Sequence, residues 1–349
     1  MIRMVDLVPR GELTTELEAA HVRVVKRGRF ILGEQVEAFE AEWAAYCGVA
    51  YCVACGNGFD ALRLALKAHN RDDSDVLVPG NTCLPTVLAP SMPFPMEPDL
   101  RTYQMDVDYL DAHVDDPMWP AHAIIPVHLY GIPANIDAIN RIARRYGLVV
   151  IEDCAQAHGA EYLGRRIGGH GNTCAWSFYP TKNLGALGDA GAVTTDNAAI
   201  ADRVRALRSY GCEGAINSRM DELQAAFLRA KLPYLDGWNE TRRRNAALYL
   251  RELRDVPGVT LPVIPDYANP CWHQFVIRHT KRNALRVHLL ERGIETQVHY
   301  DPPPHKALGY NVDLPITEML SREVVSLPVA PHVTQEMVMD VVRGIKEFG

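Results

Sequence analysis

The chain of 349 residues lacks the features that mark membrane proteins and nucleic-acid-binding proteins. It has no apolar run of membrane-spanning length, and its first residues show no long apolar segment of the secretory type. It also has no basic tail or stripe, and its formal net charge is -7. We therefore expect a cytoplasmic protein that binds neither a membrane nor nucleic acid. The short basic run at residues 242–244 is expected to be a solvated helix face.

Paired metal-ligand motifs are missing as well. The eight cysteines are scattered, and the CxxC spacing of Cys52 and Cys55 has no second CxxC or histidine pair to complete a zinc site. We expect these two thiols to lie reduced in a buried strand and predict no metal site. The absence of internal repeats and low-complexity tracts excludes a solenoid. What is present, 48% hydrophobic and 23% charged residues, is the composition of an ordinary globular protein.

The first half of the chain alternates between helix-like and strand-like segments. Apolar residues at helical spacing predict helices over residues 34–46, 60–68 and 136–146. Short apolar runs predict strands over residues 50–54, 75–79, 123–127, 148–151, 173–178 and 191–195. This alternation predicts an α/β fold, in which a mostly parallel sheet carries helices on both faces.

The second half of the chain has a different pattern of expected helices and strands. Residues 219–253 form one helical region that is interrupted near Pro233. Beyond it we expect strands at 272–278 and 295–299, and helices at 281–292, 317–325 and 334–348. The chain is too long for one average domain. We therefore expect a large domain over residues 1–236 and a smaller α+β domain over residues 237–349.

The most informative segment, residues 176–185, places Lys182 among apolar and small residues. Burial lowers the pKa of an amine, and a neutral lysine can form a Schiff base. Upstream, an apolar run ends in Glu152 and Asp153, as a buried parallel strand ends at a polar cleft. Enzymes that use pyridoxal phosphate (PLP) need such a lysine and a carboxylate for the pyridine nitrogen. A surface-loop lysine and an ordinary strand-end aspartate are the alternatives.

Two helix starts are candidate anion sites. Gly56 and Gly58 lie in a turn between a strand and a helix, where free backbone amides and the helix dipole favour an anion. The alternative is a plain connection capped by Asn57 or Asp60. The second start, at residues 217–222, offers an amide, a hydroxyl and a guanidinium from Asn217, Ser218 and Arg219, and helix capping is again the alternative.

Histidines follow several of the expected strands. His128, His158, His299 and His305 occupy loop-side positions, and the last two bracket a rigid proline-rich loop. A single histidine at a strand end is more often structural than catalytic. Four of them predict a polar cleft without assigning a role to any one.

Together these motifs resemble those of the DegT/DnrJ/EryC1/StrS aminotransferases. The resemblance covers nearly the whole chain and rests on residues 28–33, 57–62, 126–131, 151–160, 177–185, 217–226 and 299–305. It implies the aspartate-aminotransferase fold (fold type I), with a mixed, mostly parallel sheet. It also implies transfer of an amino group from L-glutamate or glutamine, through a pyridoxamine phosphate form, to a keto sugar. A nucleotide-linked keto-deoxyhexose is the favoured acceptor.

Three other functions fit the same motifs to different degrees. A keto-cyclitol aminotransferase of the aminoglycoside type would use the same residues. A non-catalytic regulator on the same fold is less favoured, because binding alone does not require Lys182 and its partners. A PLP-dependent dehydratase is disfavoured, since close relatives of that type carry histidine in place of Lys182.

The resemblance implies a role for each matching residue. Lys182 is the Schiff-base lysine and proton shuttle, and Asp153 pairs with the pyridine nitrogen. The other implied cofactor contacts are Gln156 near the phenolic oxygen, Cys83 against the ring, and Ser177 with the backbone of Gly58 and Phe59 around the phosphate. Asn217 reaches the phosphate of the neighbouring subunit's cofactor, which implies a homodimer with shared sites. The implied substrate-side residues are Tyr179, Arg219, His299 and His305.

Of the departures from the family pattern, two concern the cofactor and the most important concerns the substrate side. Relatives commonly have threonine where Phe59 stands, and an aromatic residue where Cys83 stands. The loop at residues 209–217 is shortened and lacks the lysine, tyrosine and histidine that relatives carry near the substrate. The sequence therefore leaves the acceptor's identity open, including whether it bears a nucleotide.

Overall fold

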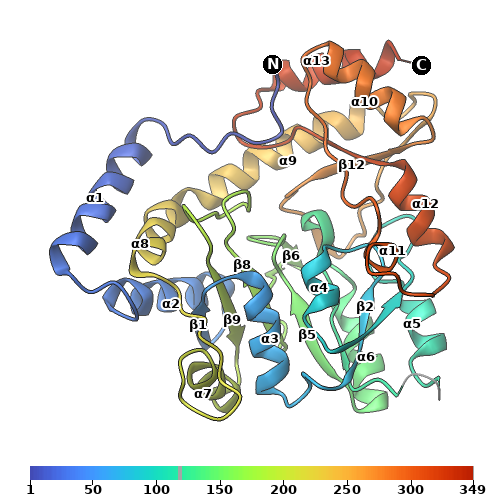
Figure 1. Cartoon of the computed structure of the whole chain (residues 1–349). Coiled ribbons are helices and arrows are strands. Elements are labelled where there is room, and N and C mark those ends of the chain that lie inside the picture. Colours follow the sequence, from blue (N-terminus) through green and yellow to red (C-terminus); the bar gives the residue numbers. More distant parts are fainter. Residues whose placement is uncertain (117–119, 349) are drawn as a thin grey trace.

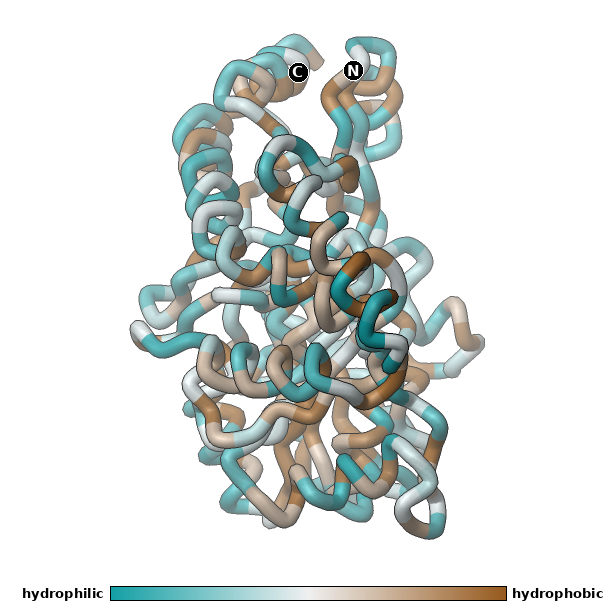
Figure 2. Tube along the Cα trace, turned by 90° about the vertical axis from the view of Figure 1, so that its left-hand side faces the viewer, coloured by the Kyte–Doolittle hydropathy of each residue, from teal (hydrophilic) through white to brown (hydrophobic). Residues whose placement is uncertain are grey.

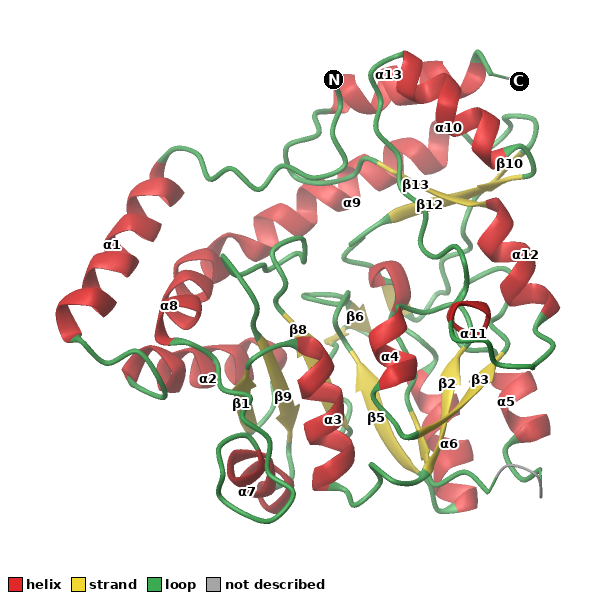
Figure 3. Cartoon of the chain, in the orientation of Figure 1, coloured by secondary structure: helices red, strands yellow, loops and turns green. Residues whose placement is uncertain are grey.

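A seven-stranded sheet forms the centre of the larger part of the molecule (Figures 1 and 3). The computed structural model describes residues 1–116 and 120–348. The strand order is β1-β9-β8-β5-β4-β2-β3. The strands are β1 (Tyr51–Cys55), β2 (Asp75–Pro79), β3 (Met92–Met96), β4 (Ala123–Ile124), β5 (Val149–Asp153), β8 (Thr173–Ser177) and β9 (Gly191–Thr195). Only β9 runs against its neighbours, which confirms the predicted mostly parallel sheet.

Helices cover the sheet and leave most strand residues buried, as expected for a parallel sheet. They are α2 (Glu34–Cys47), α3 (Gly58–Ala68), α4 (Leu84–Leu88), α5 (Val107–His113), α6 (Ile136–Tyr146) and α7 (Ala198–Leu207). The predicted helices at 34–46, 60–68 and 136–146 are confirmed to within two residues. Cys52 and Cys55 lie buried in β1, as expected.

Helix α1 (Glu12–Arg27) was not predicted, and it projects to one side of the molecule beside α8 (Glu222–Lys231) (Figure 1). Leu17, Ala20 and Val24 of α1 are buried against α8. Their helical spacing is the signal that could have predicted α1. Ahead of α1 the chain crosses to the C-terminal part, where Ile2 forms a parallel bridge with Ile294.

The C-terminal part has its own antiparallel sheet, in the order β10-β12-β13, and its own apolar core. Its elements are α9 (Leu235–Glu252), β10 (Val259–Thr260), β12 (Phe275–His279), α10 (Arg282–Glu291), α11 (Pro304–Ala307), α12 (Pro315–Glu323), β13 (Val324–Leu327) and α13 (Gln335–Lys346). Further small elements are the sheet β11 (Ala268–Asn269), β6 (Glu161–Tyr162) and β7 (Arg165–Arg166), and the 3-10 turns η1 (Leu129–Gly131) and η2 (Leu232–Tyr234). The turn η2 confirms the predicted interruption near Pro233.

Two predictions for this part are wrong. The expected helix at 317–325 ends at Glu323, because the valine-rich residues that follow pair with β12 as strand β13. The expected strand at 295–299 is reduced to one bridge between Gln297 and Ser326.

Helix α9 runs from the large sheet towards the C-terminal core, and both chain ends lie at that far end (Figure 1). Hydrophilic residues predominate on the outer helix turns (Figure 2). In the described ranges no helix combines the length and apolar character needed to span a bilayer. The division at residue 237 stays a prediction, and the bridge of Ile2 adds the first residues of the chain to the C-terminal part.

Candidate active site

Lys182 lies in the loop between β8 and β9, beside the end of β5. Burial lowers the pKa of its ammonium group, while the nearby Cys83 and Asp153 oppose that shift. A solvated surface-loop lysine would not be desolvated in this way. The site therefore increases the share of the neutral amine, which is the form that attacks a carbonyl.

Asp153 ends strand β5 and is 6% exposed. One carboxylate oxygen accepts a hydrogen bond from the Thr86 hydroxyl at 2.8 Å, and the other accepts one from the Ala155 amide at 3.1 Å. These two donors hold the carboxylate in a fixed orientation. Thr86, on α4, was not among the predicted site residues, although it follows Cys83 at the start of the same helix.

Gln156 and Cys83 meet at a third side chain, Tyr300. The Gln156 amide donates to the Tyr300 hydroxyl at 3.0 Å, and its carbonyl accepts from the Tyr130 amide at 2.6 Å. Burial and the neighbouring Cys83 thiol raise the pKa of Tyr300 well above its usual value. The phenol therefore stays protonated and can donate a hydrogen bond. Sequence reasoning missed Tyr300, whose one signal was its position directly after His299.

The glycine turn before α3 packs directly on Ser177. A Cβ atom added to Gly58 would lie 2.4 Å from the Ser177 Cβ, so only glycine fits. Asn57 caps the helix by accepting from the Asp60 amide at 2.8 Å, as the capping alternative expected. The first-turn amides of Gly58 and Phe59 have no acceptor within the helix. The cap and an anion site are therefore compatible.

Neither Asn217 nor Ser218 caps helix α8 as the alternative expected, because the N-cap position is Asp221. Helix α8 starts at Glu222, after the loop. Ser218 instead donates to Asp60 at 2.7 Å and accepts from the Gly56 amide at 3.1 Å, which fastens this loop to the glycine turn. Asn217 is exposed on the same loop, and the Arg219 guanidinium lies 5.7 Å from the centre of the Tyr210 ring.

A cavity of about 460 Å³ adjoins Lys182. Residues 4–13, the loop around Lys182, helices α8 and α9, and residues 329–332 of the C-terminal part contribute to its walls. Of the predicted residues, Lys182 and His299 line the cavity, together with His273 and Gln274, which sequence reasoning missed. The other predicted cofactor residues lie outside this lining and are connected to Lys182 through Cys83 and Asp153.

The histidines of this region are neutral. Burial lowers the pKa of His299 to about 4, and its ring nitrogens lie 2.7 Å from the Ser326 hydroxyl and 2.9 Å from the Gln274 amide nitrogen. Burial also lowers the pKa of His158 to about 3, in a cage of Trp43, Trp176 and Phe178. Of these two histidines His299 lines the cavity, and as a neutral ring it adds no positive charge there.

Three of the predicted substrate residues, His305, Tyr179 and Arg219, lie away from the cavity lining. His305 is fully buried on α11, 3.4 Å from Glu318. Tyr179 is 53% exposed on the loop that leads to Lys182. The structure therefore brings together Lys182, Asp153, Cys83 and Gln156, and it leaves the substrate roles of His305, Tyr179 and Arg219 as predictions.

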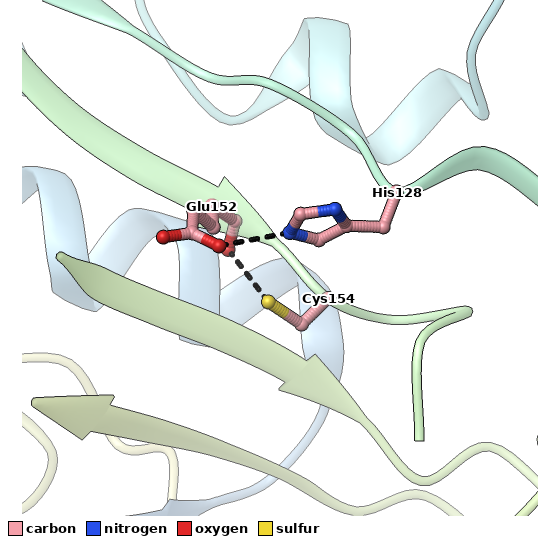
Figure 4. Close-up of side chains that lie close together, drawn as sticks. All are labelled: His128, Glu152 and Cys154. Atoms are coloured by element: carbon pink, nitrogen blue, oxygen red, sulfur yellow. Dashed lines mark hydrogen bonds and ion pairs between the residues drawn. The ribbon is translucent and has the colours of Figure 1, made fainter. Parts of the chain in front are cut away.

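A second polar group, His128 with Glu152 and Cys154, has its hydrogen bonds satisfied by neighbouring residues (Figure 4). The His128 ring accepts from the Ala134 amide at 3.0 Å, so its other nitrogen donates to Glu152 at 2.9 Å. Glu152 also accepts from Asn172 at 2.8 Å, and the Cys154 thiol lies 3.6 Å from the Glu152 carbonyl. Because these bonds use the group's donor and acceptor capacity, we assign it a structural role.

The strand order, the half-buried lysine, the strand-end aspartate and the glycine turn at one sheet edge define an α/β enzyme of the aspartate-aminotransferase class, fold type I. Residues 12–346 match the model of the DegT/DnrJ/EryC1/StrS aminotransferase family. The chain belongs to this family and is an aminotransferase by class.

Two relatives match most of their length. The erythromycin biosynthesis sensory transduction protein EryC1 of Saccharopolyspora erythraea is 44% identical over 96% of this chain and 96% of its own. The dTDP-3-amino-3,4,6-trideoxy-alpha-D-glucose transaminase of Streptomyces venezuelae is 42% identical over 97% of this chain and 93% of its own.

Two solved structures are also similar. S. venezuelae DesV, in complex with a ketimine intermediate, has a TM-score of 0.94 at 40% identity, with 99% of this chain and 98% of that chain covered. Bacillus subtilis NtdA, with bound cofactor PMP, has a TM-score of 0.87 at 27% identity, with 99% of this chain and 86% of that chain covered.

Proposed function

We propose that this chain is a PLP-dependent aminotransferase that moves an amino group from L-glutamate or glutamine to a nucleotide-linked keto sugar. The observation that carries the proposal is the desolvated amine of Lys182 beside the oriented carboxylate of Asp153, in a member of an aminotransferase family. A lysine and a carboxylate in this relation are what the cofactor requires.

The residues present fit the cofactor. Gly58 has no room for a side chain against Ser177, and the adjoining helix amides and the Ser177 hydroxyl suit a phosphate. Asp153 would hold the pyridine nitrogen, Cys83 would lie against the ring, and Gln156 would lie near the phenolic oxygen. When bound, the cofactor supplies an electron sink for a carbanion at the reacting carbon.

Lys182 would attach the cofactor and then move the proton. Because desolvation lowers its pKa, the neutral amine can accept a proton at Nζ from one reacting atom and return it to another. The Thr86 and Ala155 donors hold the Asp153 carboxylate in its orientation, so the proton-carrying role falls to Lys182. Proton transfer in both directions therefore relies on Lys182 as the base.

The acceptor follows from the relatives. The S. venezuelae relative is named as a transaminase of a dTDP-linked amino deoxysugar, which supports a nucleotide-linked keto-deoxyhexose here. His299 lines the cavity beside Lys182, and because both ring nitrogens are bonded to Ser326 and Gln274, it would contact the sugar through the carbon atoms of its neutral ring. Arg219 and Tyr179 are offered as contacts for the nucleotide or donor side.

We also propose a homodimer with shared sites in the cytoplasm. Asn217 is exposed at the end of the loop that Ser218 fastens to the glycine turn, where a second subunit could be reached. Exposed apolar side chains near the site could be covered by that subunit, namely Phe30, Ile31, Leu84, Leu88 and Leu187. All eight cysteines are unpaired, which favours a reducing compartment.

A regulatory role is the second candidate, because the relative EryC1 is named a sensory transduction protein. The two functions differ in a simple test. Purified protein should show the visible absorption of lysine-bound PLP, L-glutamate should remove it, and a nucleotide-linked keto sugar should restore it. Feeding keto sugars and keto-inositols to the aminated form, followed by mass spectrometry, separates a sugar from a cyclitol acceptor. A protein that stays colourless with added PLP contradicts the proposal.

A further inference from the structure

Two neighbouring arginines on α9 differ in a way that the aminotransferase motifs do not explain. Arg242 was expected on a solvated helix face, and that expectation is wrong, because the residue is 6% exposed. Its Nη1 donates to the carbonyls of Trp272 and His273, at 3.1 and 3.2 Å. Arg243 is held similarly, by the carbonyls of Pro270 and Gly159, both at 3.1 Å.

The difference lies in the compensation of their charges. Arg243 has a carboxylate in its own chain, Glu240, at 3.9 Å. For Arg242, no carboxylate in the described ranges forms an ion pair, and its buried Nε has no hydrogen-bond partner there. Burial lowers the pKa of Arg242 to about 10, with only the Cys271 thiol opposing the shift, so the guanidinium remains charged at neutral pH. A buried cation without a counter-ion is costly unless a ligand compensates it.

Arg242 also faces the cavity beside Lys182. Both residues line its wall, and both lower the pKa of His273, which places that imidazole close to the two cations. The two carboxylates of the lining, Asp6 and Glu12, come from the N-terminal segment, and Asp6 is already paired with Arg10. The cavity wall therefore presents the charged Arg242 guanidinium, the amines of Lys182 and Lys231, and the neutral His273 and His299 to whatever enters.

We propose that Arg242 binds the α-carboxylate of the amino donor and so selects an amino acid rather than a simple amine. This inference rests on the proposed function, which requires that the donor react at Lys182. A guanidinium suits a carboxylate because it combines a permanent positive charge with N–H donors. The two carbonyls engage Nη1 of Arg242 and the protein encloses Nε, so the donor's carboxylate would approach Nη2 from the cavity and supply the missing counter-ion.

The test measures binding without turnover. Calorimetric titration of the purified protein with glutarate, a dicarboxylate that cannot transaminate, should give a dissociation constant that rises roughly 10- to 100-fold in Arg242→Met. The rise should be smaller in Arg242→Lys, which keeps the positive charge but loses the guanidinium N–H donors. Glutaramide, the uncharged analogue, should bind equally to all three proteins.

Arg243→Met is the matched control. It removes comparable bonds to backbone carbonyls from the same helix but leaves the cavity lining intact. It should leave glutarate affinity within about twofold of wild type. Equal glutarate affinity in wild type and both Arg242 variants would overturn the inference, and so would an equal loss in Arg243→Met.

The two proposals can fail separately. If L-glutamate removes the cofactor's visible absorption equally well in wild type and Arg242→Lys, the aminotransferase stands and Arg242 has no donor role. If no variant carries PLP but glutarate binding still depends on Arg242, the carboxylate site stands and the proposed reaction fails.

Discussion

Two carboxylates stand next to each other at the end of β5, and their surroundings differ. Glu152 is fully buried and bonded to His128 and Asn172. Asp153 points towards Thr86 and lies near the amine of Lys182. Adjacent residues of a strand face opposite sides of its sheet, so one strand end serves both groups. Where every buried polar atom has a partner in the chain, the group is structural. Where a carboxylate lies beside a desolvated amine that lines a cavity, as Asp153 does beside Lys182, it is a candidate for function.

The largest effect is expected for the group that contains Asp153 and Lys182. Lys182→Ala should lower turnover by more than about 10³-fold, because it removes both the covalent attachment and the proton carrier. Single-turnover kinetics with L-glutamate checks this, and thermal unfolding should stay close to wild type. Full turnover in Lys182→Ala would show that the group of Asp153 and Lys182 is no more functional than the group of Glu152 and His128.

The paired substitutions Asp153→Asn and Glu152→Gln test the contrast directly. Asp153→Asn should lower turnover roughly 10²-fold, the scale of one electrostatic contact to the reacting centre, and should change stability little. Glu152→Gln should leave turnover per folded molecule nearly unchanged and lower the free energy of unfolding by about 1–3 kcal/mol. Steady-state rates and urea titrations on both variants give the answer. The reverse pattern would show that the roles are exchanged.

Low pH should reduce the stability that the group of Glu152, His128 and Cys154 contributes. Burial raises the pKa of Glu152, but the hydrogen bonds from His128 and Asn172 outweigh burial and hold the pKa below its ordinary value of 4.5. The unfolded chain therefore takes up the proton first, so this contribution to stability is present above pH 4.5 and is lost as pH falls through the folded pKa. Glu152→Gln should show a smaller loss of stability below that pH. An unchanged acid dependence would argue against the bond to His128.

A second pH-dependent contribution to stability comes from His158. Burial lowers its pKa from 6.5 to about 3, so the unfolded chain binds one more proton between these values and stability falls as pH drops through that window. This contribution reaches about 1.4 kcal/mol per pH unit. His158→Phe keeps an aromatic ring in the cage and should remove it, which urea titrations at several pH values can measure. A variant with the wild-type slope would contradict a neutral His158.

Local patterns were enough to predict part of this structure. Lys182 and Asp153 follow apolar strand runs, and the glycine turn lies between a strand and a helix, so neighbouring residues alone indicated their setting. The alternation of apolar segments likewise predicted every strand of the large sheet except β3, and it predicted three of the six helices that cover the sheet, α2, α3 and α6.

The failures involve distant partners. Tyr300 meets Gln156 across 144 residues, and the carbonyls that bury Arg242 lie about 30 residues further along the chain. Residues 324–327 became a strand only because β12 is available to pair with them. His305 belonged to a recognisable motif, but α11 places it against Glu318. None of these contacts leaves a periodic signal in the sequence.

The central claim is that Lys182 carries the cofactor, and the chain contains a rival. Lys231 lines the same cavity, and burial lowers its pKa to about 8. Borohydride reduction of the PLP-loaded protein, followed by peptide mass spectrometry, locates the modified lysine. We predict a reduced pyridoxyl group on the peptide that contains Lys182 and none on the peptide that contains Lys231. Modification of Lys231, or of no lysine, would contradict the account.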